Sequence, residues 1–458
     1  MKSSLGWKVL LMSTLLLPVS GKADSDLQSV LEERIGGDRS GACLVAARVS
    51  ETVEWATACA DDEAGRTLDL ESRFEIGSVS KAMQGVVVAA LAEEGALAID
   101  EPVEDLLPDG ASVPRYDDEP IRIRHLLTHE SGLPRLPSDM LMSDPHDPYA
   151  DMDADTLLSL LADTELTRPP GEAFEYSNFG AMLLTLAITH RSGEGFQTLL
   201  DEHIFSPLEM AATSLDGPVV QGHDQLGNSV TPWGFSDNLA GVGGVRASLE
   251  DMIRFTQANL HAPDGSLGKA IRTSHEQLAS PSDQDMAWGW LLLPFNDRSI
   301  LFHNGGTAGM TAELAIDRER GVGVVVLADT GLATQGGLTD LALHLLDPEV
   351  EMRTPSPRPT ASEDRPPLSD FEGEYALYDD DGPFMDMVLR LFGEDGTLYL
   401  QASTPQQEQP AVEMDYVGDE RFVREDIDLE IRFLRNEEGR ITGLAFSQGP
   451  YELDGRPQ

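Results

Sequence analysis

The chain has 458 residues, more than one compact core usually holds, which predicts two or three domains. Its 80 acidic residues against 32 basic ones give a formal net charge of −48, and such a surface repels nucleic acid and anionic membranes. Nucleic acid is therefore excluded as a partner.

Lysine is nearly absent from this acidic chain, which carries it only at Lys2, Lys8, Lys22, Lys81 and Lys269. Dense carboxylates repel one another unless counterions screen them, so we hypothesise a high-salt, halophilic habitat. The expected result of a salt titration is a free energy of unfolding that rises with added salt. Equal stability without added salt would remove the hypothesis.

The N-terminus has the pattern of a secretory signal peptide. Lys2 and Lys8 precede an apolar run from Val9 to Val19. The small residues Gly21 and Ala23 follow it at acceptable cleavage positions. We predict a signal peptide over 1–23, with an uncleaved anchor as the alternative. Either one exports the chain, to the periplasm or beyond the cell. No later run of roughly twenty apolar residues occurs, so no stable membrane insertion is expected after cleavage.

Two β-prone runs, 42–49 and 52–59, flank a turn and predict an N-terminal hairpin. The only cysteines, Cys43 and Cys59, are placed symmetrically about that turn. A cross-strand disulfide and two buried free thiols both fit this arrangement.

A helix over 78–94 follows, with little polar face and with Gly95 as its stop. The stretch of about 97–235 is expected to form an inserted helical lobe, with helices over 155–162 and 179–190. Ser248 with Asp251 begins another helix. Four strands are then predicted, at 288–293, 299–303, 310–316 and 321–327. The fold class is therefore α+β, an antiparallel sheet flanked by helices.

The C-terminal part has a different pattern. Residues 351–367 are rich in Pro and charge and indicate a linker between a domain over 24–350 and a second one over 368–458. Strict alternation from Ile427 to Phe433, with turns at Asp395-Gly396 and Glu438-Gly439, predicts a small antiparallel β-domain.

Ser78 and Lys81 are the first candidate catalytic pair. Three residues apart at a helix start, they lie on one face, and the helix N-terminus favours an oxyanion beside Ser78. The pattern is weak alone, because Ser-x-x-Lys arises often by chance.

Tyr176-Ser177-Asn178 lies at the mouth of a predicted helix. A nearby Lys81 ammonium is expected to lower the pKa of the Tyr176 phenol from about 10, so that the tyrosine shuttles protons. The alternative is structural: Tyr176 packs and Asn178 caps the helix.

His303-Asn304-Gly305-Gly306 ends a strand-like run. Its glycines would let a substrate backbone approach the strand, and Gly306 could donate an oxyanion N–H. A lone histidine at a strand end is otherwise more often structural.

The order Ser-x-x-Lys, Tyr-x-Asn, His-x-Gly resembles the three motifs of class C β-lactamases and related penicillin-binding esterases and peptidases. Segments 74–77, 125–134 and 243–248 are similar to recurring segments of that family, and the similarity spans about residues 28 to 347. The β-domain resembles, more weakly, the lipocalin-like extensions of some members.

The resemblance implies that Ser78 is the nucleophile and that Lys81 and Tyr176 handle protons. It places Asn178 toward the substrate amide and makes the N–H groups of Ser78 and Gly306 the oxyanion donors. His303-Asn304-Gly305 stands where β-lactamases of this type usually carry Lys-Thr-Gly. A mostly neutral histidine holds a substrate carboxylate less strongly than lysine, which puts strong β-lactamase activity in doubt.

These residues predict a serine hydrolase that acts through a Ser78 acyl-enzyme on β-lactams, D-Ala-D-Ala peptides of peptidoglycan or small esters. The rival is a penicillin-binding sensor or binding protein that acylates without turnover. No metal or organic cofactor is implied. Neither a Gly-x-Ser-x-Gly elbow nor a His-Glu-x-x-His cluster occurs, which argues against α/β-hydrolases and zinc hydrolases.

Overall fold

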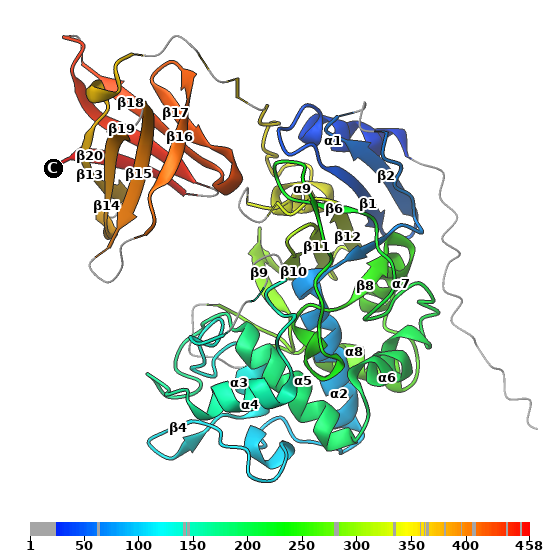
Figure 1. Cartoon of the computed structure of the whole chain (residues 1–458). Coiled ribbons are helices and arrows are strands. Elements are labelled where there is room, and N and C mark those ends of the chain that lie inside the picture. The colour runs from blue at the N-terminus through cyan, green and yellow to red at the C-terminus, as the bar shows by residue number, and fades with distance from the viewer. Residues whose placement is uncertain are drawn as a thin grey trace, which may run out of the picture.

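The structure is a computed structural model. It describes residues 24–458 apart from 62–64, 141–142, 144–146, 279–283, 333–335, 358, 361, 363–365, 380–381, 395, 405–408, 437 and 449–450. The predicted signal peptide and Asp395 lie outside the described residues. The described chain forms an α+β part and a C-terminal β-barrel (Figure 1), which confirms the predicted fold class. None of its helices is long and apolar enough to cross a bilayer.

The centre of the α+β part is an antiparallel sheet of six strands in the order β2-β1-β12-β11-β10-β9. The strands are β1 (Cys43–Val49), β2 (Val53–Cys59), β9 (Leu291–Phe295), β10 (Arg298–Gly306), β11 (Thr311–Asp317) and β12 (Val322–Ala328). All seven residues of β11 and of β12 are buried, as expected for strands covered on both faces.

The predicted hairpin is confirmed, and Cys43 stands directly opposite Cys59 in its register. The two cysteines form a disulfide, so of the two alternatives the structure has the bridge. The strand predicted from Trp288 begins only at Leu291. Residues before it form an irregular segment pressed against helix α2 (Ser80–Glu93), where a Cβ on Gly289 would stand 2.2 Å from the Lys81 carbonyl oxygen.

Two layers of helices cover this sheet. Helices α1 (Ser25–Ile35) and α9 (Thr339–Leu346) pack on one face, and α7 (Leu249–Leu260) packs on the other, with α2 and α8 (Ser266–Ser274) beyond it. The predicted start of α7 is confirmed, because the Ser248 side chain accepts a hydrogen bond from the Asp251 N–H.

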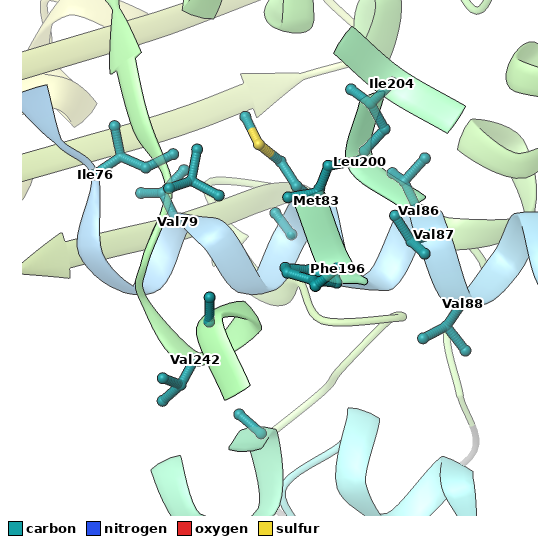
Figure 2. Close-up of a cluster of buried hydrophobic side chains, with 14 of the residues drawn as sticks. Ile76, Val79, Met83, Val86, Val87, Val88, Phe196, Leu200, Ile204 and Val242 are labelled. Atoms are coloured by element: carbon teal, nitrogen blue, oxygen red, sulfur yellow. The ribbon is translucent and has the colours of Figure 1, made fainter. Parts of the chain in front are cut away.

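Helix α2 is enclosed on nearly every side, as its apolar sequence predicts. Its side chains pack with those of Phe196, Leu200 and Ile204 (Figure 2). Gly85 is required there, because a Cβ would stand 1.8 Å from the Trp288 carbonyl oxygen. The predicted helix differs at its start: Gly77–Val79 form a 3-10 turn before α2 begins.

The inserted lobe is mainly helical and adds two short hairpins that the sequence did not indicate. Its helices are α3 (Ile123–Leu127), α4 (Ala154–Ala162), α5 (Asn178–Ser192) and α6 (Phe196–Leu200). The hairpins are β4 (Arg115–Tyr116) with β5 (Glu119–Pro120), and β6 (Gly222–His223) with β7 (Ser229–Val230). Strands β3 (Arg73–Glu75) and β8 (Arg246–Ser248) pair with each other, and β3 leads into the 3-10 turn at Gly77–Val79.

The C-terminal part is a closed antiparallel barrel of eight strands around its own apolar core. Its strands are β13 (Gly373–Asp379), β14 (Gly382–Glu394), β15 (Thr397–Ser403), β16 (Val412–Gly418), β17 (Arg421–Arg424), β18 (Leu429–Arg435), β19 (Ile441–Gln448) and β20 (Tyr451–Pro457). The alternating run predicted from Ile427 becomes a strand only at Leu429, because Glu425–Ile427 form a 3-10 turn. A partly exposed salt bridge between Arg39 and Asp428 joins the barrel to the α+β part.

Candidate active site

A cleft of about 650 Å³ lies between the central sheet and the helical lobe. Residues distant in the sequence line it together: Ser78, Tyr176, Asn178, Gly305 and Gly306. Lys81 and His303 are buried behind them, with 2% and 1% of their surfaces exposed. The structure thus brings all seven predicted site residues to one place.

Ser78 lies in the 3-10 turn ahead of α2 and is partly exposed at the cleft. The turn depends on the preceding Gly77, which has a φ of 49°. A Cβ on Gly77 would also stand 2.7 Å from the Gly306 nitrogen. The missing side chain therefore lets the end of β10 lie directly against the turn that carries Ser78.

The Lys81 amine has three oxygen neighbours and no water-facing side. Its Nζ lies 3.0 Å from Ser78 Oγ, 3.0 Å from Asn178 Oδ1 and 2.6 Å from the Val242 carbonyl oxygen. Burial, aided by the positive charge of Arg135, holds the pKa of Lys81 well below its usual range.

A neutral Lys81 has a defined hydrogen-bonding pattern. A carbonyl oxygen can only accept, so the two N–H groups of the neutral amine point to Asn178 and Val242. Its lone pair is then left for the hydroxyl of Ser78. In this protonation state, Lys81 is placed to accept the serine proton.

The expected effect of Lys81 on Tyr176 is wrong. The pKa of Tyr176 is raised, not lowered, because burial outweighs its hydrogen bond with Ser78 and the charge of Arg135. Lys81 Nζ lies 5.1 Å from the centre of the tyrosine ring, but burial lowers the pKa of Lys81 and so disfavours the ammonium on which the expectation depended. Tyr176 is a neutral phenol in this site.

His129 fixes the position of Tyr176 from three directions. Its ring packs against the tyrosine ring, with the ring centres 4.3 Å apart and the planes tilted by 36°. Its Nδ1 accepts from the Ser177 N–H at 3.2 Å, and its carbonyl accepts from the Glu175 N–H at 2.8 Å. His129 holds a φ of 57°, which is rare for a residue other than glycine. Such strain is typical of sites whose geometry the surrounding structure imposes.

Asn178 is not the helix cap that the structural alternative proposed. The Ser177 side chain caps α5 by accepting from the Gly180 N–H. The Asn178 amide is instead held at both ends, since its Oδ1 accepts from Lys81 and its Nδ2 donates to Tyr149 Oη at 2.9 Å.

His303 is neutral and has one unused nitrogen. Burial lowers its pKa to about 3. Its Nδ1 lies 2.7 Å from the Asn304 carbonyl oxygen and therefore carries the proton, which makes Nε2 an acceptor. That Nε2 is buried without a hydrogen-bond partner among the described residues. The centre of the His303 ring lies 6.4 Å from the centre of the Tyr176 ring.

Within the described ranges, no group of three or more His, Cys, Asp or Glu side chains is arranged to hold a metal ion.

Residues 27–348 match the family model described as Beta-lactamase. The chain belongs to the Beta-lactamase family. This confirms the resemblance stated from the three motifs.

Two curated relatives of the chain illustrate the family. Protein flp of Staphylococcus aureus (strain MW2) is 28% identical over 272 residues, 56% of this chain and 53% of flp. D-alanyl-D-alanine-carboxypeptidase/endopeptidase AmpH of Escherichia coli (strain K12) is 26% identical over 299 residues, 60% of this chain and 77% of AmpH. The chain thus spans about half the length of flp.

Two solved structures share the fold of this Beta-lactamase family member. Beta-lactamase/D-alanine carboxypeptidase from Yersinia pestis has a TM-score of 0.61 at 24% identity and covers 71% of this chain and 99% of its own. The octameric penicillin-binding protein homologue from Pyrococcus abyssi has a TM-score of 0.58 at 20% identity and covers 94% of this chain and 99% of its own. At these identities, the likeness is one of fold.

Sequence reasoning missed three residues of the site: His129, Arg135 and Tyr149. His129 lies within segment 125–134, which was noted only for its family likeness, and Arg135 directly follows that segment. These two had a signal that could have drawn attention to them. Tyr149 stands in a stretch without motif or periodicity, and only the fold brings it to Asn178.

Proposed function

We propose that this Beta-lactamase family member is an exported serine hydrolase that forms an acyl-enzyme at Ser78. The observation that carries the proposal is the 3.0 Å separation of Lys81 Nζ and Ser78 Oγ beside Tyr176 in one cleft. Export rests on the signal-like sequence over 1–23.

In acylation, the neutral Lys81 amine takes the proton of the Ser78 hydroxyl as its oxygen attacks the substrate carbonyl. The backbone N–H groups of Ser78 and Gly306 hold the oxyanion that forms. Asn178 and Val242 keep the Lys81 lone pair directed at Ser78, which favours this direction of proton transfer.

The leaving group then needs a proton. Tyr176 is a neutral phenol hydrogen-bonded to Ser78, so it gives its proton to the leaving group and regains one from Lys81. The unpartnered His303 Nε2 is an acceptor that can orient the phenol or the leaving amine. Water enters after the leaving group has departed, and hydrolysis of the ester restores Ser78.

For the substrate, we propose D-Ala-D-Ala peptides of peptidoglycan or small esters ahead of β-lactams. The relative AmpH is named a D-alanyl-D-alanine-carboxypeptidase/endopeptidase. His303 is neutral where β-lactamases of this type usually carry lysine, which removes one fixed charge for a β-lactam carboxylate.

Intact mass spectrometry with a fluorescent penicillin tests the proposal. We expect the wild-type chain to gain the mass of one penicillin and then lose it, and Ser78→Ala to gain none. Ser80→Ala is a matched control, because Ser80 lies in the same segment but is fully buried. A parallel panel of nitrocefin, a D-Ala-D-Ala peptide and p-nitrophenyl butyrate assigns the substrate.

A permanent adduct would favour the penicillin-binding sensor over the hydrolase. An adduct that survives Ser78→Ala would contradict the proposed nucleophile. Absence of both adduct and hydrolysis in the wild-type chain would overturn the proposed function as a whole.

A further inference from the structure

The cleft has an uneven distribution of charge that its catalytic residues do not explain. Among the described residues that line it, Arg135 is the one basic side chain and Glu313 is the one acidic side chain. The Arg135 guanidinium carbon lies 5.3 Å from the centre of the Tyr176 ring, and the residue is exposed. A cation in the active site is notable in a chain whose net charge is −48.

The backbone of Arg135 is fixed although its side chain is exposed. Its carbonyl accepts from the Asn178 N–H at 2.9 Å and from the Phe179 N–H at 3.2 Å, at the start of α5. The main chain that carries the guanidinium is therefore fixed at the start of α5, and the guanidinium itself lies over the Tyr176 ring. Among the described residues, no carboxylate lies within ion-pair distance of it.

Neighbouring groups neither add to the positive charge of Arg135 nor neutralise it. Lys81 and His303 are buried behind the cleft wall, and burial lowers the pKa of both. Burial raises the pKa of Glu313 to about 8, and its oxygens accept from the Leu338 N–H and the Thr339 hydroxyl, each at 3.1 Å. Near neutral pH, Arg135 is therefore the fixed charge among the described residues that line the cleft.

We propose that Arg135 binds a carboxylate on the leaving group of the substrate, so that the enzyme prefers acyl donors whose leaving group is a free amino acid. The inference rests on the proposed function, because Tyr176 marks the side from which the leaving group receives its proton. A guanidinium is suited to this task, since its fork of N–H donors matches a carboxylate. Arg135 thus replaces, from the lobe, the charge that His303 does not supply from the sheet.

The test compares Arg135→Gln and Arg135→Lys on one peptide ending in D-Ala-D-Ala and on the same peptide ending in D-alaninamide. We expect Arg135→Gln to raise KM for the free acid by about 10- to 100-fold, the range for a hydrogen bond to a charged group. KM for the amide should change less than twofold. Arg135→Lys should retain part of the preference, and added salt should raise the wild-type KM for the acid only.

Arg432→Gln is the matched control, because it removes the same charge from an exposed position on barrel strand β18. Equal losses on acid and amide, or no loss on either, would overturn the inference. Binding of both peptides to Ser78→Ala, with and without Arg135→Gln, separates it from the proposed function. A preference for the acid that depends on Arg135 would uphold the inference even if the wild type showed no turnover.

Discussion

Replacing Lys81 by methionine is expected to lower kcat/KM for acylation by about 10³-fold or more, the effect of losing a positioned general base. Methionine fills a similar volume but has no lone pair to accept the Ser78 proton. The same change should raise the melting temperature, because an amine buried beside Ser78, Asn178 and Val242 is costly to desolvate and methionine is not.

The pH dependence of this gain has a definite sign. The folded-state pKa of Lys81 is lowered, so between that pKa and the ordinary value of 10.5 the unfolded chain holds a proton that the folded chain lacks. Lowering the pH within this window therefore favours unfolding of the wild-type chain. The contribution of Lys81 to this slope should disappear in Lys81→Met, and wild-type activity should fall as pH drops through the folded-state pKa.

Thermal unfolding and acylation rates between pH 6 and 9 measure both effects. Lys269→Met is a matched control, since Lys269 is the other lysine of the described chain and its side chain is 62% exposed. It should change neither the acylation rate nor the pH slope. If Lys81→Met acylates normally, or if it is no more stable than the wild type at neutral pH, the neutral-amine assignment is wrong.

Local patterns carried the sequence predictions that the structure confirms. The Ser78–Lys81 contact follows from spacing along one short segment, and the position of Cys43 opposite Cys59 follows from symmetry about a hairpin turn. The symmetry left a disulfide and two free thiols both open, and the structure has the disulfide. The six strands of the sheet and helices α2, α4, α5 and α7 follow from the sequence pattern, with shifts of at most three residues at their ends. Helices α1, α3, α6, α8 and α9 were not predicted. These features depend on neighbours in the chain, which a sequence displays.

The features that were missed depend on contacts between distant parts of the chain. Tyr149 and Asn178 are 29 residues apart and meet only in the folded lobe, and no period in the sequence indicates this contact. The pKa of Tyr176 was predicted with the wrong sign because spacing shows that a lysine is near but not that both groups are buried. Alternation predicted β-strands at the C-terminus, but not that eight of them close into a barrel.

Gly305 was correctly predicted to need the absence of a side chain, but the structural reason differs from the expected one. From the sequence, its lack of a side chain is expected to let the substrate approach the strand. In the structure, a Cβ on Gly305 would stand 2.0 Å from the Ile76 carbonyl oxygen and 2.9 Å from the Ser78 nitrogen. The glycine therefore lets β10 pack against the backbone of the turn that carries Ser78.

Replacing Gly305 by alanine is accordingly expected to lower kcat/KM by about 10²-fold or more, since a displacement of about 1 Å in a catalytic group can cost that much. The overlap is with backbone atoms, so either β10 or the Ser78 turn must shift, and the melting temperature should fall as well. Acylation rates and thermal unfolding measure the two losses.

Gly393→Ala, on barrel strand β14, separates the local effect from a general cost of losing glycine. Its new methyl group would meet side-chain atoms of Glu372 and Leu368, which can move aside, so acylation should be unchanged. An alanine at 305 could also unfold the chain, and far-ultraviolet circular dichroism identifies that case. A folded Gly305→Ala that acylates at the wild-type rate would show that the close packing of β10 against the Ser78 turn does not position the nucleophile.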